Sequence, residues 1–407
     1  MRSRMVRLLL VACVTCAVGV VGAQGAPRGD AAPASLEARL TKALASPYVD
    51  PGRTGALAVD LRTGQVIYRH NASRALVPAS TEKLTVAFTA LKELGPSYRF
   101  HTEVLGAGKL VGDQWHGNLF LVGHGDPTLG IADIGRLARD VKAAGIRRVT
   151  GSVIADERHF DARRGAPGWK SYFVGIESPP LSALVVNGAP LSGANSSATV
   201  AATALALALA RRGVAVAHVP RAGRVAREAV PIAIDHSARL SVIVQEMNRN
   251  SHNFVAEMLL KELGAFGAGR GSTVAGSAVV RKALSEAGVP MNGVRVVDGS
   301  GLSSLDRLTA EALVALLRTG AVDPGVRSAF VSSLPVAGVS GTLKNRLAKG
   351  PTLRRVVAKT GTTSLACSLA GFVGDRYAFA ILQNGSPVSY WSARAAQDRF
   401  VTVLARS

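Results

Sequence analysis

The chain has 407 residues and a formal net charge of +21, with 48 Lys and Arg residues against 27 Asp and Glu. A protein of this size can bury a sufficient core without disulfides. The positive charge is dispersed, aromatic residues make up only 5% of the chain, and no nucleic-acid-binding motif is present. These features exclude nucleic acid as a partner.

The first 23 residues have the pattern of an export signal. Three arginines within the first seven residues precede the apolar run 8–21, and small residues follow at Ala23 and Ala26. This pattern predicts a signal peptide over 1–23, with cleavage after Ala23, or alternatively after Ala26. An uncleaved anchor is the competing interpretation. We therefore expect an extracytoplasmic protein, periplasmic, secreted or associated with the cell wall.

Removal of the signal peptide has consequences for cysteine and charge. Cys13 and Cys16 would be lost, and Cys367 alone would remain, so no internal disulfide is expected. The remaining positive charge favours anionic partners, such as anionic envelope polymers or lipid head groups. An arginine-rich composition without such a partner is the alternative.

The elements expected in chain order begin with a linker over 24–35, rich in Ala, Gly and Pro. The apolar spacing then predicts several helices and strands before residue 230. Helices are expected over 36–44, 80–94, 131–144 and 198–211, and strands over 55–61, 66–70, 104–110, 118–122 and 149–155.

After residue 230 the pattern returns to one long unit. Helices are expected over 238–248, 254–263 and 390–404, and strands over 356–360, 369–373 and 377–383. Strands near both ends of the chain with helices between them predict an α+β domain formed by 36–100 and 230–407. Residues 101–229 are long enough to form an inserted domain of their own.

Three short motifs occur once each and in a fixed order. They are Ser80-x-x-Lys83, Ser251-x-Asn253 and Lys359-Thr360-Gly361. Each motif alone is more often structural, as a helix cap, a loop or a strand-end turn. Together they are the active-site elements of penicillin-recognising serine acyl-transferases.

The first motif provides a nucleophile and a base. Ser80 is expected at a helix N-terminus, where its backbone N–H can help to bind an oxyanion. Lys83 lies one turn further on and can reach the Ser80 hydroxyl. A base must be neutral, so burial or a nearby charge, for example that of Lys359, is expected to lower the pKa of Lys83.

The other two motifs are expected to bind substrate and transfer protons. Ser251 can relay a proton between Lys83 and the leaving amine, and Asn253 can hold a substrate amide. The residues of the third motif and its successor form a strand edge that suits a carboxylate, with Gly361 allowing close approach. These substrate-binding residues are Lys359, Thr360, Gly361 and Thr362, and the Thr362 N–H is the second expected oxyanion donor.

No metal and no cofactor are expected from the sequence. The eight histidines show no H-x-x-x-H or comparable ligand spacing. His252 lies inside the second motif and is interpreted as a spacer.

With these motifs the chain resembles the D-alanyl-D-alanine carboxypeptidases/endopeptidases of the low-molecular-mass class C penicillin-binding proteins. The resemblance extends over nearly all of the mature chain and includes further segments beyond the motifs. These are Gly125–Leu129, Ser178–Leu184, Asp298–Ser303 and Ser340–Leu343. A long segment separates the first two motifs, as in this family. It is shorter than is usual for the family, which suggests that one of two usual subdomains is reduced or missing.

The resemblance implies the serine β-lactamase/D,D-peptidase fold, with an antiparallel sheet and flanking helices interrupted by an inserted α/β domain. It also implies removal of the terminal D-alanine from peptidoglycan stem peptides, with cleavage of D-amino-acid crosslinks left open. By motif, Ser80 would be acylated, with Lys83 as its base and Ser251 as a further catalytic residue. Peptidoglycan peptides would be the substrates, and β-lactam antibiotics would be covalent inhibitors.

Two other functions compete with this one. A β-lactamase needs a base that activates a deacylating water, and no E-x-x-L-N-like segment lies between Asn253 and Lys359. Glu257 is interpreted as structural. A cell-wall-binding or penicillin-sensing protein without catalysis would have no need for the complete set of proton-transfer residues.

Overall fold

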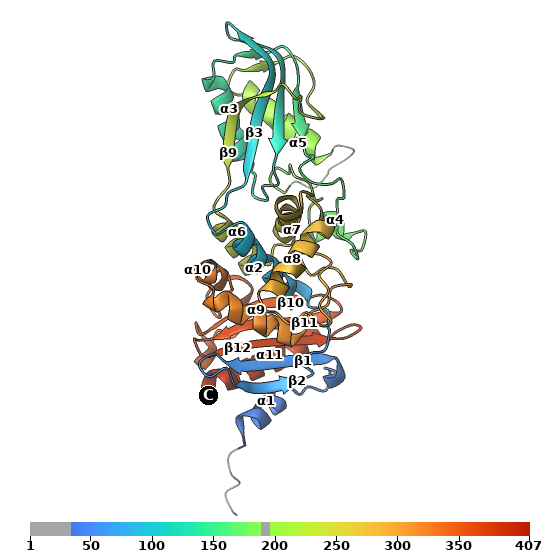
Figure 1. Ribbon diagram of the computed structural model, residues 1–407, viewed down its shortest axis with the longest axis vertical. Coiled ribbons are helices and arrows are strands. Elements are labelled where there is room, and N and C mark those ends of the chain that lie inside the picture. The colour runs from blue at the N-terminus through green and yellow to red at the C-terminus, as the bar shows by residue number, and fades with distance from the viewer. Residues whose placement is uncertain (1–33, 189–195) are drawn as a thin grey trace, which may run out of the picture. The chain divides into compact units, whose positions relative to one another are not determined.

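The computed structural model describes residues 34–188 and 196–407. The predicted signal peptide and most of the predicted linker lie outside these residues. Residues 36–407 form one compact unit that contains two β-sheets (Figure 1).

The first sheet has five antiparallel strands and joins the two ends of the chain. Its strand order is β10-β11-β12-β1-β2. Strand β1 pairs with β12 along its whole length, with Thr54 opposite Gln383 at one end and Asp60 opposite Tyr377 at the other. The strands are β1 (Thr54–Asp60), β2 (Val66–His70), β10 (Val356–Thr362), β11 (Ala366–Val373) and β12 (Tyr377–Asn384). This sheet confirms the expected α+β fold with an antiparallel sheet.

Alternate residues of this sheet face two different hydrophobic cores. In β12, Ala378, Ala380 and Leu382 belong to one core, whereas Phe379 and Ile381 belong to the other. This follows from the two-residue period of a strand. Helices therefore cover both faces, and both faces are apolar.

The helices divide between these two cores. Helices α1 (Leu36–Leu44) and α11 (Tyr390–Arg406) contribute to the second core, on one face of the sheet. The other core includes residues of five longer helices and the short α10. They are α2 (Lys83–Glu93), α6 (Leu240–Asn250), α7 (Asn253–Ala268), α8 (Thr273–Glu286), α9 (Ala310–Val322) and α10 (Arg327–Ser332).

The second sheet is formed by residues 101–236, which we call the insertion. It follows the order β7-β5-β4-β3-β9, with β6 pairing with β4 and β8. Its strands are β3 (His101–Val111), β4 (Gln114–Gly123), β5 (Arg148–Val149), β6 (Val153–Asp156), β7 (Ala215–Val216), β8 (Arg221–Ala222) and β9 (Val230–His236). Helices α3 (Ile131–Ala143) and α5 (Ser197–Ala210) share a core with it, and the short α4 spans Phe173–Ile176.

Two sequence expectations for the insertion differ from the structure. The single strand expected over 149–155 is divided into β5 and β6, and between them the Ser152 N–H donates to the side-chain oxygen of Asn118 at 2.8 Å. The second sheet also continues past the expected boundary at 229, since β9 pairs with β3. The separation of the compact unit into a peptidase domain and an inserted domain stays a prediction.

Within residues 34–188 and 196–407, no helix combines the length and the apolar character needed to cross a membrane.

Candidate active site

Ser80 lies in a tight turn that leads directly into α2. A 3₁₀ helix over Ala79–Glu82 places Ser80 one turn before Lys83, the first residue of α2. The Nζ of Lys83 lies 3.0 Å from the Oγ of Ser80. Ala79, immediately before Ser80, has a φ of 48°, a conformation that costs energy for a residue with a side chain. The neighbouring structure therefore holds the nucleophile in a strained turn.

Lys83 is fully buried and uses all three of its donors. Besides Ser80, it contacts the Oδ1 of Asn253 at 2.9 Å and the backbone oxygen of Ser300 at 2.6 Å. Burial lowers the pKa of Lys83 to about 8, although the carboxyl groups of Asp298 and Glu257 oppose this shift. Desolvation, one of the two expected causes, is therefore the largest cause of the lowered pKa.

Ser251 occupies the junction of α6 and α7 in a left-handed conformation, with a φ of 58°. Its Oγ accepts a hydrogen bond from the Nζ of Lys359 at 2.9 Å. The sequence led us to expect Ser251 between Lys83 and the leaving amine. In this structure its hydroxyl group is instead paired with the lysine of the third motif.

Asn253 begins α7 and connects the site to the insertion. Its side-chain oxygen accepts from Lys83, and its Nδ2 donates to the backbone oxygen of Glu177 at 2.9 Å. To hold a substrate amide, Asn253 would exchange the contact with Glu177 for one with the substrate.

The third motif lies on the edge strand β10. Lys359 is fully buried, and burial lowers its pKa well below the usual range, with the Lys83 charge adding to the shift. The Thr360 hydroxyl donates to Thr342 at 2.7 Å. The guanidinium of Arg394, on α11, donates to the Thr362 hydroxyl at 3.2 Å. Arg394 thus brings a permanent positive charge to this edge.

Gly361 allows β10 to pass beside the nucleophile. A Cβ at this position would lie 2.9 Å from the backbone nitrogen of Ser80 and 2.2 Å from the Oγ of Ser368. The expected role was close approach of a substrate to the strand. The immediate requirement in the structure is close approach of the strand to the Ser80 turn and to β11.

A loop over 298–303 supplies the backbone oxygen of Ser300 that accepts from Lys83. The Oε1 of Glu257 accepts from the backbone N–H groups of Gly299 and Ser300 at 2.9 and 2.8 Å. Asp298 accepts from Trp169 of the insertion at 2.7 Å. These contacts fix the Ser300 carbonyl that binds Lys83.

Sequence reasoning did not assign roles in the site to several of these residues. They are Glu177, Trp169, Arg394, Asp298 and Ser300. The segment Asp298–Ser303 was recognised as part of the resemblance, and that was the available signal for two of them. Trp169, Glu177 and Arg394 approach only through tertiary packing. Glu257, interpreted as structural, holds the supporting loop in place.

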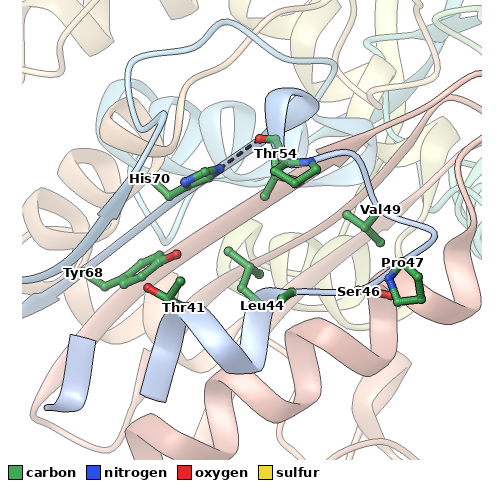
Figure 2. Close-up of a pocket in the computed structure, with 10 residues that line it drawn as sticks. Thr41, Leu44, Ser46, Pro47, Val49, Thr54, Tyr68 and His70 are labelled. Atoms are coloured by element: carbon green, nitrogen blue, oxygen red, sulfur yellow. Dashed lines mark hydrogen bonds between the residues drawn. The ribbon is translucent and has the colours of Figure 1, made fainter. Parts of the chain in front are cut away.

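A separate cavity of about 410 Å³ lies beside α1 and β2 (Figure 2). It is lined mainly by apolar groups, including Leu44, Val49 and Tyr68, and His70 at its wall contacts the backbone oxygen of Pro51 at 2.9 Å. None of the residues that line it belongs to the three motifs. It is therefore distinct from the candidate active site.

Known proteins are similar to this chain over most of its length. The model of the D-Ala-D-Ala carboxypeptidase 3 (S13) family matches residues 36–193 and 189–407. The D-alanyl-D-alanine carboxypeptidase of Actinomadura sp. (strain R39) is 32% identical, over 89% of this chain and 83% of that protein. Carboxypeptidase Rv3627c of Mycobacterium tuberculosis is 30% identical, over 93% of this chain and 86% of its own length.

Solved structures show the same fold. Penicillin-binding protein 4 from Haemophilus influenzae superposes with a TM-score of 0.77 at 20% identity, over 88% of this chain and 97% of that chain. A penicillin G-acylated predatory endopeptidase from Bdellovibrio bacteriovorus superposes with a TM-score of 0.54 at 20% identity, over 85% and 90% of the two chains. The match to the family model covers nearly the whole described chain, which confirms the resemblance found in the sequence, and the chain belongs to the D-Ala-D-Ala carboxypeptidase 3 (S13) family.

Proposed function

We propose that the protein is a serine D,D-peptidase that releases the terminal D-alanine of peptidoglycan stem peptides through an acyl-enzyme on Ser80. The observation that carries this proposal is the 3.0 Å contact between the Ser80 hydroxyl and a fully buried Lys83. Because burial lowers the pKa of Lys83 to about 8, a useful fraction of this amine is neutral near neutral pH.

Acylation begins with proton transfer from the Ser80 hydroxyl to neutral Lys83. The Ser80 oxygen then attacks the carbonyl carbon of the D-Ala–D-Ala bond. The backbone N–H groups of Ser80 and Thr362 are the proposed donors to the resulting oxyanion. When the intermediate collapses, the C–N bond breaks and the acyl group stays on Ser80.

The leaving amine must gain a proton as that bond breaks. Ser251 is the proposed donor, because its oxygen already accepts from Lys359 and its own O–H can point toward the substrate. Lys359 can then return a proton to Ser251. Lys83 then passes the proton that it took from Ser80 to Lys359, which restores both amines to their starting states. In the second half-reaction, water gives a proton to Lys83 and attacks the acyl carbonyl, and Lys83 returns that proton to the Ser80 oxygen as the ester bond breaks.

The substrate ends in a carboxylate, and the β10 edge offers suitable partners. The hydroxyl groups of Thr360 and Thr362 can donate to its oxygens. Arg394 is already in contact with Thr362 and carries a permanent positive charge. Lys359 contributes less charge, because burial lowers its pKa. We propose that this edge selects peptides with a free C-terminal carboxylate.

We also propose an extracytoplasmic location and covalent inhibition by β-lactams. The predicted export signal and the peptidoglycan substrate support the location. The net charge of +21 supports a further association with anionic envelope polymers.

The test is D-alanine release from a diacyl-L-Lys-D-Ala-D-Ala peptide by the mature protein, with Ser80→Ala as the matched variant. We expect release that depends on Ser80 and is blocked by benzylpenicillin, together with a penicilloyl adduct on intact protein by mass spectrometry. Thermal unfolding of both proteins verifies that Ser80→Ala is folded.

Other outcomes distinguish the alternatives. Rapid hydrolysis of benzylpenicillin without a lasting adduct would indicate a β-lactamase. A stable adduct without D-alanine release would contradict the carboxypeptidase and direct the assay to crosslinked muropeptides. Binding to cell walls with neither adduct nor release would favour a protein without catalysis.

A further inference from the structure

Three histidines lie side by side at one end of the second sheet. His101, the first residue of β3, is paired with His236 at the end of β9. His124 directly follows Gly123, which is paired with Thr102, so it lies next to His101 on the other side. The rings of His101 and His124 stack with centroids 4.0 Å apart, and that of His236 lies 6.4 Å from His101.

Glu103 adds a carboxylate to this row. It lies two residues after His101 on β3, and therefore on the same face of the strand. Its Oε2 is 3.2 Å from the Nε2 of His124. Ligand atoms of His101, Glu103 and His124 all lie within 4.8 Å of one another, and all three residues are partly buried.

We propose that His101, Glu103 and His124 form a binding site for a divalent transition-metal ion, with Zn²⁺ as the best match. Two imidazole nitrogens and one carboxylate oxygen are a ligand set that Zn²⁺ uses, with water at the fourth position. Histidine nitrogen makes Mg²⁺ and Ca²⁺ poor candidates, since both prefer oxygen ligands.

The spacing of the ligand atoms fits this ion. With bonds of about 2.1 Å to a tetrahedral Zn²⁺, ligand atoms lie roughly 3.4 Å apart. Glu103 and His124 are already at 3.2 Å, and the His101 ring, now stacked on that of His124, would turn toward them to complete the site.

The site is separate from the acyl-transfer residues. The ring of His159 lies 5.3 Å from that of His124, and its Nε2 is 2.7 Å from the Oε2 of Glu262 on α7. Glu262 follows Asn253 by nine residues, which corresponds to about 14 Å along the helix axis. A metal here would therefore take no part in the reaction at Ser80 and would instead fasten the ends of β3 and β4 together near α7.

The sequence prediction of no metal site depended on local spacing. His101 and His124 are 23 positions apart and come from different strands, so no local pattern reveals them. Only the pairing of the strands brings them together.

The experiment measures Zn²⁺ binding to the chelator-treated, untagged mature protein by isothermal titration calorimetry. Co²⁺ replaces Zn²⁺ in a parallel visible absorption titration. The variants are His124→Asn, His101→Asn and Glu103→Gln. The control is His116→Asn, because His116 is an exposed histidine on β4, the strand that His124 directly follows. Circular dichroism verifies the fold of each variant.

We expect one Zn²⁺ per chain, a tetrahedral Co²⁺ spectrum and an upward shift of the unfolding temperature with Zn²⁺ but not with Mg²⁺. Each ligand variant should lose at least tenfold in Zn²⁺ affinity, whereas His116→Asn should bind as the unaltered protein does. Absence of Zn²⁺ binding would overturn the proposal, as would binding that every folded ligand variant retains.

Discussion

Helix α7 contacts two clusters of ionisable residues that are organised in different ways. At its first residue, Asn253 joins an acyl-transfer site in which Lys83 and Lys359 are fully buried. Further along, Glu262 contacts His159, beside a set of histidines that are partly exposed. In the first cluster Lys83 uses all three of its donors within the protein, whereas in the second the side chains of His124 and Glu103 are each 25% exposed.

This difference in burial fits the two functions, proton transfer in the first cluster and metal binding in the second. A buried lysine with fixed partners has a lowered pKa and an oriented amine, as proton transfer requires. Partly exposed imidazoles can admit an ion from solution. The insertion and the peptidase core thus use α7 as a shared element, and variants on each side should affect different measurements.

The largest effect should follow removal of the proposed base. Lys83→Met retains the apolar volume of the side chain but cannot accept the proton of Ser80. We expect the rate of acylation by benzylpenicillin to fall by about 10²–10⁴-fold. Lys92→Met, on the exposed part of the same helix, is the control, because Lys92 pairs with Asp323 outside the site. Acylation of the Lys83 variant at the normal rate would contradict the role of Lys83.

The pH profile tests whether the buried amine limits the reaction. Burial lowers the pKa of Lys83 to about 8, and only its neutral form accepts a proton. kcat/KM for D-alanine release should therefore fall about tenfold per pH unit as the pH decreases below that value, and level off above it. A profile that is flat across this range would show that another group controls acylation. Zn²⁺ binding should not change the profile.

Arg394 tests recognition of the carboxylate. We expect Arg394→Gln to raise KM about tenfold for the free acid peptide, since loss of one charged contact is worth roughly 1.4 kcal/mol. A peptide with a C-terminal amide should be affected much less. Arg406→Gln, at the exposed end of the same helix, controls for the general loss of positive charge. Equal effects on both peptides would remove Arg394 from the proposed binding edge.

Much of the fold was accessible from the sequence because its periodicity is local. The expected bounds of α1 and β2 agree with the structure, and the final hairpin was located to within a few residues. The predicted bounds are wrong where contacts between distant segments determine where a strand begins or ends. Between β5 and β6 the Ser152 N–H donates to the side chain of Asn118 on β4, and β9 joins the second sheet by pairing with β3.

The same distinction separates the two clusters. The acyl-transfer residues come in three short motifs, so their residue types could be recognised before their positions were known. The structure brings Ser80, Lys83 and Asn253 into one hydrogen-bonded group, and Lys359 with Ser251 into another. The histidines and Arg394 have no local motif, because each reaches its neighbours from a different element.

The smallest effect should come from the contact that ties the insertion to the supporting loop. The indole of Trp169 donates to Asp298, and the loop that Asp298 begins holds the Ser300 carbonyl against Lys83. Trp169→Phe removes that donor while keeping an aromatic ring, which should lower the free energy of unfolding by about 1–2 kcal/mol.

Activity of the same variant shows whether the insertion positions the base. If Trp169 acts through Asp298, kcat should fall a few-fold with little change in KM, and the pH midpoint should move because the surroundings of Lys83 have changed. Trp391→Phe is the control, since Trp391 is 70% exposed and lies outside this loop. A loss of stability with an unchanged pH midpoint would mean that the contact stabilises the fold without tuning Lys83.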